Sequence, residues 1–176
     1  MEFLQRGDET GGPPVELDWR EFPYAGKFVM TDTGKALLRE DGVILAGAAF
    51  SVDRTDSDRV WIRYLTVRYD RQGEQLGPKL ANSLAGDLLE RDFERVMIAV
   101  NNPTAFRALY RAGFAFTGRE TGLAELVLER PARDSTTTYL VGLRQFADRE
   151  LPAGRRKRLE AWIEAGSPPA SLSDTD

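Results

Sequence analysis

Hydrophobic residues along the chain follow two different spacings. Over residues 77–91, leucines recur every four positions with alanines beside them, which predicts an amphipathic helix with one buried face. Residues 60–67 and 95–100 are instead rich in β-branched and other apolar residues, which predicts a strand on either side of this helix.

Shorter patterns predict the neighbouring elements. Residues 35–40 and 42–52 read as two strands joined by a turn at Asp41-Gly42. Residues 104–112 read as a second helix that Gly113 ends, and residues 115–117 and 123–129 as a closing pair of strands. The order strand, helix, strand, helix, strand predicts an α/β (α+β) domain with a mixed central sheet flanked by helices.

The two ends of the chain lack this order. Residues 1–14 are polar and close on two glycines and two prolines, so we expect a flexible arm before a domain at 15–130. Residues 15–34 hold aromatic side chains without a clear period. Beyond Pro131, residues 139–148 and 153–165 predict a C-terminal extension of two amphipathic helices, within 131–165. Residues 166–176 are rich in Ser, Pro and Asp and are expected to be disordered.

Composition removes several kinds of chemistry. The 176 residues suit one domain but include no cysteine and no histidine. This excludes disulfides, catalytic thiols, Ser-His-Asp arrangements and zinc sites built on Cys or His. Proton transfer must then use Asp, Glu, Tyr, Lys or water. A metal would need oxygen ligands, and because no EF-hand spacing is present we expect none.

Charge and hydropathy limit the partners. The net charge of −4 argues against nucleic acid. No apolar run approaches the roughly 20 residues that span a bilayer, and the N-terminus has no apolar core of a signal peptide. We therefore expect a cytoplasmic protein with neither a membrane nor a nucleic-acid partner.

Residues 65–80 form the most informative segment. A predicted strand runs into a turn that contains Gly73, and the turn opens a helix near Gly77, with Pro78 suited to the first helical position. Free N–H groups at such a helix start favour an anion, for which a diphosphate is a natural ligand, and Arg71 and Lys79 would add positive charge. A tight connection that binds no ligand is the alternative.

This segment resembles motif A of the GNAT superfamily of N-acetyltransferases. Leu65 and Val67 match the Leu-x-Val of the family strand. Gln72 and Gly77 match the ends of the turn pattern that follows it. The resemblance implies that acetyl-CoA is the co-substrate and that this turn holds its diphosphate.

One position departs from the motif. Gln75 stands where the first motif glycine is expected, which narrows the turn and weakens coenzyme binding unless Gly73 compensates. The residues that the resemblance assigns to the coenzyme are Leu65, Thr66, Val67, Gln72, Gly73, Glu74, Gln75, Leu76, Gly77, Pro78 and Asn102.

Residues 101–114 resemble motif B of the same superfamily. Asn102-Pro103 is a helix cap, and Ala105 and the Gly113-Phe114 exit also match. The family tyrosine is expected four residues before the glycine, where this chain has Leu109, and Tyr110 follows one residue later. One residue turns a helical side chain by about 100°, so Tyr110 is either the proton donor of the family reaction or a packing residue.

The resemblance also implies a mechanism. An acceptor amine attacks the thioester directly, with no acyl-enzyme, and backbone N–H groups near residues 65–67 stabilise the oxyanion. The coenzyme arm would lie where the fourth and fifth strands splay apart. Tyr110 would protonate the departing thiolate. The base is a carboxylate or water, with Glu120 and Glu125 as our candidates.

For several other side chains both a functional and a purely structural role remain open. Glu40 and Asp41 are further base candidates, though each acid is more simply a solvated surface residue. Arg63 and Tyr64 line the acceptor side or are sheet residues. The basic run 155–158 is a solvated helix face or contacts an anion.

The sequence therefore predicts an acetyl-CoA-dependent N-acyltransferase that acts on a small amine or a protein amine. The alternative is a non-catalytic GNAT-like module that binds acyl-CoA as a sensor or assembly part. Leu159, Trp162 and Ile163 form a buried stripe of the last helix or cover a second copy, so a homodimer is possible.

Overall fold

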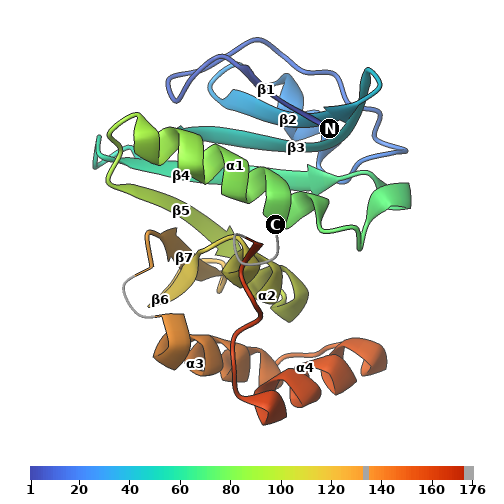
Figure 1. Ribbon diagram of the computed structural model, residues 1–176, viewed down its shortest axis with the longest axis vertical. Coiled ribbons are helices and arrows are strands. Elements are labelled where there is room, and N and C mark those ends of the chain that lie inside the picture. The colour runs from blue at the N-terminus through green and yellow to red at the C-terminus, as the bar shows by residue number, and fades with distance from the viewer. Residues whose placement is uncertain (133–134, 173–176) are drawn as a thin grey trace. The chain divides into compact units, whose positions relative to one another are not determined.

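The computed structural model describes residues 1–132 and 135–172, and of residues 135–137 only the backbone. Within it the chain forms two compact units, Met1–Met97 and Ile98–Asp176, which are described separately. Each unit contains β-strands and helices, which are labelled in Figure 1.

Seven strands are hydrogen-bonded in the order β1-β2-β3-β4-β5-β7-β6. Their bounds are β1 (Glu2–Arg6), β2 (Gly34–Glu40), β3 (Val43–Val52), β4 (Arg59–Val67), β5 (Arg95–Val100), β6 (Ala115–Glu120) and β7 (Leu126–Arg130). The helices are α1 (Leu76–Glu90), α2 (Pro103–Arg111), α3 (Ser135–Ala147) and α4 (Ala153–Ala165), with short 3₁₀ turns η1 (Ala25–Val29) and η2 (Tyr69–Arg71). Strands β1 to β4 pair antiparallel, and helix α1 connects β4 to its neighbour β5. The prediction of a mixed sheet flanked by helices is confirmed.

The hairpin between β2 and β3 has the predicted turn. Asp41 and Gly42 both adopt positive φ, 50° and 80°, and Glu40 pairs with Val43 across them. Such turns match the twist of the flanking strands, which explains why Asp-Gly was a reliable signal here.

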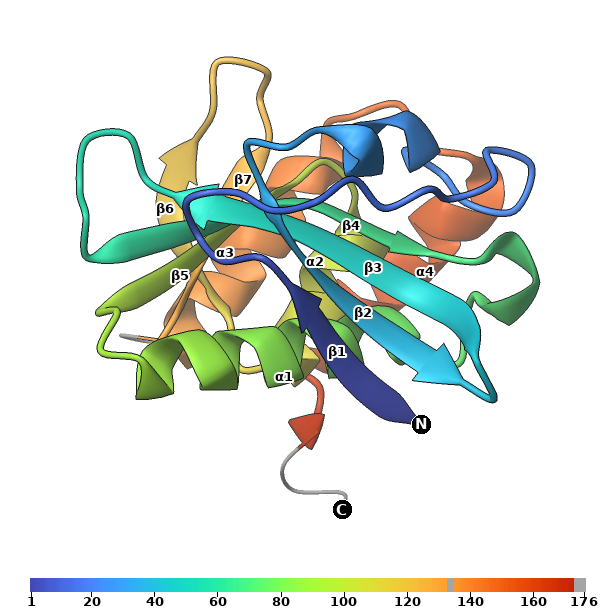
Figure 2. The same cartoon turned by 90° about the horizontal axis from the view of Figure 1, so that it is seen from above.

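The core of the first unit lies on both faces of β2, β3 and β4. Helix α1 packs against these three strands, and its leucines 80, 84 and 88 are fully buried. On the other face, Val15 and Phe28 pack with Leu37 and Ala49. Figure 2 shows α1 and the loop that carries η1 on opposite sides of these strands. Residues 15–28, which had no clear period, thus cover a sheet face as an irregular segment.

The prediction of a flexible arm at residues 1–14 is wrong for its first part. Residues 2–6 form β1, which pairs antiparallel with β2 from Glu2 opposite Arg39 to Arg6 opposite Lys35. A charge-assisted bond of 2.7 Å joins Arg39 Nη2 to Glu2 Oε2. The strand is only five residues long and polar at both ends, so its local pattern is weak, and its stability comes from pairing with a distant strand.

The second unit is centred on a cluster of aromatic side chains. Rings of Phe106, Tyr110, Phe116, Tyr139 and Phe146 lie with centroids 4.9–6.1 Å apart in the pairs that touch. The predicted C-terminal helices are α3 and α4, which pack against each other (Figure 1). Helix α3 begins at residue 135, four residues before the predicted start. Helix α4 ends at Gly166, and part of the predicted tail, residues 173–176, lies outside the described residues.

Candidate functional site

The turn after β4 contains two residues with a left-handed backbone. Gly73 has φ 89°, and Gln75, the residue before α1, has φ 63° and ψ 21°. A glycine adopts these angles most readily, so Gln75 keeps the backbone that the missing motif glycine would have. The departure at this position therefore changes a side chain and not the path of the turn.

Helix α1 begins one residue earlier than predicted, which corrects the place of Pro78. Leu76 is the first helical residue, and Pro78 is the third. The first intrahelical bond runs from Lys79 N to Gln75 O at 3.1 Å. Pro78 has no N–H to offer, and its position is still among those whose N–H has no intrahelical acceptor.

The start of α1 presents unused donors. Within the described part of the chain, the N–H groups of Gln75, Leu76 and Gly77 have no hydrogen-bond acceptor. They stand at the positive end of a 15-residue helix dipole. Such a group of donors binds phosphate oxygens well.

Gly77 lies against the two strand residues that complete the motif. A Cβ at this position would be 3.6 Å from Val67 Cγ2 and 3.9 Å from Leu65 Cδ2, which is ordinary contact. The packing of α1 on β4 therefore does not require a glycine. Gly77 is buried at the first turn of the helix, and as a glycine it places no side chain between its backbone and a ligand.

The charge of Arg71 is already matched. Its guanidinium pairs with Glu74 at 2.8 Å and with Glu40 at 3.6 Å. The extra positive charge expected from Arg71 is thus largely compensated. Lys79, the other basic side chain expected beside the turn, is exposed and has no ion pair among the described residues. Glu40, one of the base candidates, is thus engaged in an ion pair with Arg71.

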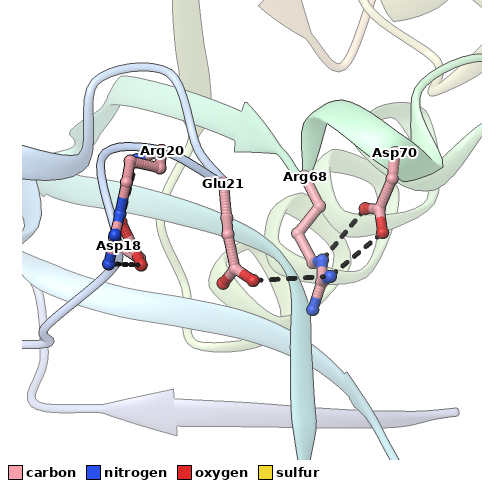
Figure 3. A network of polar contacts seen from close by, with 5 residues as sticks. All are labelled: Asp18, Arg20, Glu21, Arg68 and Asp70. Atoms are coloured by element: carbon pink, nitrogen blue, oxygen red, sulfur yellow. Dashed lines mark hydrogen bonds and ion pairs between the residues drawn. The ribbon is translucent and has the colours of Figure 1, made fainter.

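A polar network fixes the beginning of the turn to the loop at residues 18–24 (Figure 3). Arg68 donates two hydrogen bonds of 3.0 Å to Asp70 and lies 3.7 Å from Glu21. The hydrogen bond from Arg68 lowers the pKa of Asp70. The N–H of Tyr69 donates to the Glu21 carbonyl at 2.9 Å, so Glu21 holds this end of β4 through both its side chain and its backbone.

A second contact between β4 and this loop is made by Thr66. Thr66 Oγ1 donates to the Pro23 carbonyl at 2.7 Å, and Thr66 is almost fully buried. Sequence reasoning missed this loop because its fixed points are contacts across more than 40 residues. The aromatic residues of segment 15–34 were the one sequence signal that this segment packs on the sheet.

The structure separates the two acceptor-side candidates, Arg63 and Tyr64. The pairing of β3 with β4 shifts so that Arg63 is an extra residue on β4, a β-bulge. Its Nε donates to Ser51 Oγ at 2.9 Å, and burial lowers the pKa of Arg63. Tyr64 instead faces the loop, with its ring centroid 6.0 Å from that of Tyr24.

Asn102 has the capping role that the sequence indicated. Its Oδ1 accepts from Ala105 N at 2.9 Å, and Pro103 follows as the first residue of α2. The proposed contact of Asn102 with the coenzyme stays a prediction.

Tyr110 is held inside the second unit. It is only 5% exposed, and its hydroxyl accepts a hydrogen bond of 2.9 Å from Phe116 N while lying 2.9 Å from Thr138 Oγ1. Its ring packs against those of Phe106 and Tyr139. These contacts favour the packing interpretation, and its role as proton donor stays a prediction.

The acidic candidates of the second unit flank one hairpin. Glu120 ends β6 and is exposed, and Glu125 precedes β7. Glu125 Oε1 accepts from Thr121 Oγ1 at 3.3 Å, and the backbone N–H of Thr121 donates to the Glu125 carbonyl at 2.9 Å. Their role as base stays a prediction.

Two further features are absent from the described residues. No group of three or more acidic side chains that could hold a metal ion occurs among them. None of the helices described is both long and apolar enough to cross a bilayer.

Comparison with known proteins points to one family. The model of the acetyltransferase (GNAT) family matches residues 3–114. This match covers β1 to α2 and both motif segments. No curated protein sequence matches significantly.

Solved structures with a related fold are distant in sequence. An N-acetyltransferase of Staphylococcus aureus Mu50 has 14% identity and TM-score 0.49, over 55% of this chain and 66% of its own. The yncA protein of Salmonella typhimurium, solved with acetyl-CoA, has 18% identity and TM-score 0.49, over 58% and 69%. The paia N-acetyltransferase of Thermoplasma acidophilum, solved with coenzyme A, has 12% identity and TM-score 0.46, over 54% and 58%. This chain thus spans just under two thirds of the Staphylococcus protein.

Proposed function

Because the chain belongs to the GNAT family of acetyltransferases, we propose that it transfers an acetyl group from acetyl-CoA to a primary amine. The observation that carries this proposal is the set of unused N–H donors at residues 75–77, next to Leu65 and Val67 of β4. In the proposal these donors bind the coenzyme diphosphate, and the N–H groups near the end of β4 face the thioester carbonyl.

The reaction follows from the groups that the chain has. The neutral acceptor amine attacks the thioester carbon, the new N–C bond forms, and the C–S bond breaks to release the thiolate. The amine loses one proton and the thiolate gains one, so no net proton is taken up. With no cysteine in the chain, transfer through an acyl-cysteine is excluded.

Proton transfer needs a base for an amine whose pKa lies near 10. We propose Glu120, Glu125 or a water molecule for this step. For the thiolate we now favour water as the proton source, because the Tyr110 hydroxyl is engaged with Phe116 and Thr138. Most of the rate would then come from positioning the two substrates.

The experiment that tests this proposal is a thiol-release screen. Acetyl-CoA is incubated with the protein and a panel of amines, polyamines and peptides, and free thiol is followed with time. We expect release that depends on both the protein and one class of amine. Coenzyme binding without release for any acceptor would favour the alternative, a non-catalytic acyl-CoA-binding module.

A further inference from the structure

Tyr24 holds an exposed ring in an unusual backbone conformation. It has φ 59° and is 58% exposed, although a left-handed backbone is disfavoured for residues with a Cβ. Its neighbours keep it there, because the Pro23 carbonyl accepts from Thr66 and the Tyr24 carbonyl accepts from Lys27 N at 2.9 Å. Strain of this kind, held by fixed contacts, is a reason to look for function.

The ring of Tyr64 and the ammonium group of Lys27 lie beside Tyr24. The Tyr24 and Tyr64 centroids are 6.0 Å apart at an interplanar angle of 41°. Lys27 Nζ lies over the Tyr64 ring at 5.5 Å from its centroid. Within the described residues Lys27 has no ion pair, so this ring is the group that its ammonium contacts. The Tyr64 ring therefore already accommodates a primary ammonium, and the Tyr24 ring lies beside it.

The surrounding charge also favours a cation. Residues 15–33 carry four carboxylates and only two basic side chains, of which Lys27 is one. Two of the four carboxylates are already paired, Asp18 with Arg20 at 2.9 Å and Glu21 with Arg68 at 3.7 Å. Glu16 and Asp32 are left to favour a cation that replaced Lys27 in this segment.

Tyr64 immediately precedes Leu65 on β4, and one strand residue advances the chain by about 3.3 Å. In the proposed function the backbone near Leu65 lies beside the thioester, so the two rings would lie close to the acceptor. A reacting amine must be neutral to attack, whereas an aromatic face prefers a charged ammonium. The rings thus suit an amine of the acceptor that does not react.

We propose that Tyr24 and Tyr64 bind the second, protonated amine of a small diamine acceptor, and that Lys27 occupies this subsite in the free protein. The inference rests on the proposed function for the transfer step, but the binding of the cation does not.

The kinetic test compares two acceptors of equal length, 1,4-diaminobutane and butylamine. The wild type should prefer the diamine in kcat/KM. Tyr64→Leu should reduce this preference about fivefold, in the range expected for a cation–π contact of about 1 kcal/mol. Tyr64→Phe should retain it, because the ring face remains. Lys27→Met should raise the preference by removing the resident cation.

Trp19→Leu is the matched control, since Trp19 is an aromatic of the same loop that is 76% exposed and makes none of the ring contacts above. It should leave the preference unchanged. An equal preference in wild type and Tyr64→Leu would overturn the subsite.

A binding test separates failure of the subsite from failure of the function. Tetramethylammonium and 1,4-diaminobutane are titrated by NMR without acetyl-CoA, with the Tyr24 and Tyr64 ring signals as the readout. Shifts at both rings in the wild type, with loss of the Tyr24 shift in Tyr64→Leu, support the subsite even if no acetyl transfer is found. Absence of shifts at millimolar ligand would overturn it even if transfer occurs.

Discussion

At the scale of single residues, Gln75 and Gly77 show which positions of the turn need a glycine. Gln75 adopts the left-handed backbone that suits glycine, and Gly77 is free of any packing need for glycine. The sequence identified both positions, yet it could not show that a glutamine would keep the turn, because that depends on local backbone energy of only about 1–2 kcal/mol.

Tyr110→Phe distinguishes packing from proton donation. We expect kcat to change by less than about twofold, in contrast to the 10²–10⁴-fold loss of a missing general acid. Unfolding free energy should fall by about 1–3 kcal/mol, because the buried N–H of Phe116 loses its acceptor. Steady-state kinetics and thermal melts measure the two effects.

Tyr139→Phe is the control for this substitution. Tyr139 is fully buried beside Tyr110, and within the described residues its hydroxyl makes no hydrogen bond of good geometry, with Arg107 as its polar neighbour. Its removal should be nearly neutral for stability. A large loss of kcat in Tyr110→Phe alone would restore the general-acid role.

Asp53 should make stability depend on pH in acid. Burial opposes its ionisation, but hydrogen bonds from Thr55 and Trp61 outweigh burial and lower the pKa of Asp53 to about 2. Its folded pKa is below the unfolded value of about 3.9, so its contribution is present above pH 4 and lost as pH falls toward 2. Melting temperature measured from pH 6 to pH 2 should show this loss.

Asp53→Asn removes that titration. The variant should be less stable at pH 6, because one of its two acceptor oxygens becomes a donor, and its melting curve should depend less on pH below 4. Parallel pH profiles of the two proteins would contradict the assignment.

At the scale of elements, the sequence predicted what local patterns determine. Helix α1 was readable from its leucine spacing, the β2–β3 hairpin from Asp-Gly, and the start of α2 from Asn102-Pro103. Strand β1 and the loop at residues 18–24 were not, because β2 and β4 hold them through contacts distant in sequence. Secondary structure of this kind depends on the tertiary partner.

Helix α3 approaches α2 closely at a glycine. A Cβ at Gly142 would overlap the Phe106 ring, so Gly142→Ala should destabilise the protein by about 1–3 kcal/mol despite the higher helix propensity of alanine. Chemical denaturation provides the measurement. Gly154→Ala in α4 is the control, since a Cβ there meets nothing within 4 Å, and it should not lower stability. Equal effects of the two substitutions would contradict the close approach.

At the scale of the whole molecule, family membership and the turn carry the account. The family match covers residues 3–114, while α3 and α4 follow it and add a helical layer to the second unit. The turn proposed to bind the coenzyme was readable from sequence because its backbone donors depend on local structure. On the acceptor side the sequence named Tyr64 but not Tyr24, because Tyr24 lies on a loop whose position only the fold determines.

The most direct test is calorimetry of acetyl-CoA binding to the wild type, Gly77→Glu and Gly86→Glu. The account predicts micromolar affinity for the wild type, about −8 kcal/mol. It predicts no binding to Gly77→Glu, because the added carboxylate repels the diphosphate at the start of α1. A Cβ at Gly77 faces Val67 and Leu65, so a melting curve must show that this variant is folded. Gly86→Glu places the same side chain later in α1, where a Cβ meets nothing, and should bind normally. Wild-type affinity in a folded Gly77→Glu variant would contradict the claim that this turn binds the coenzyme.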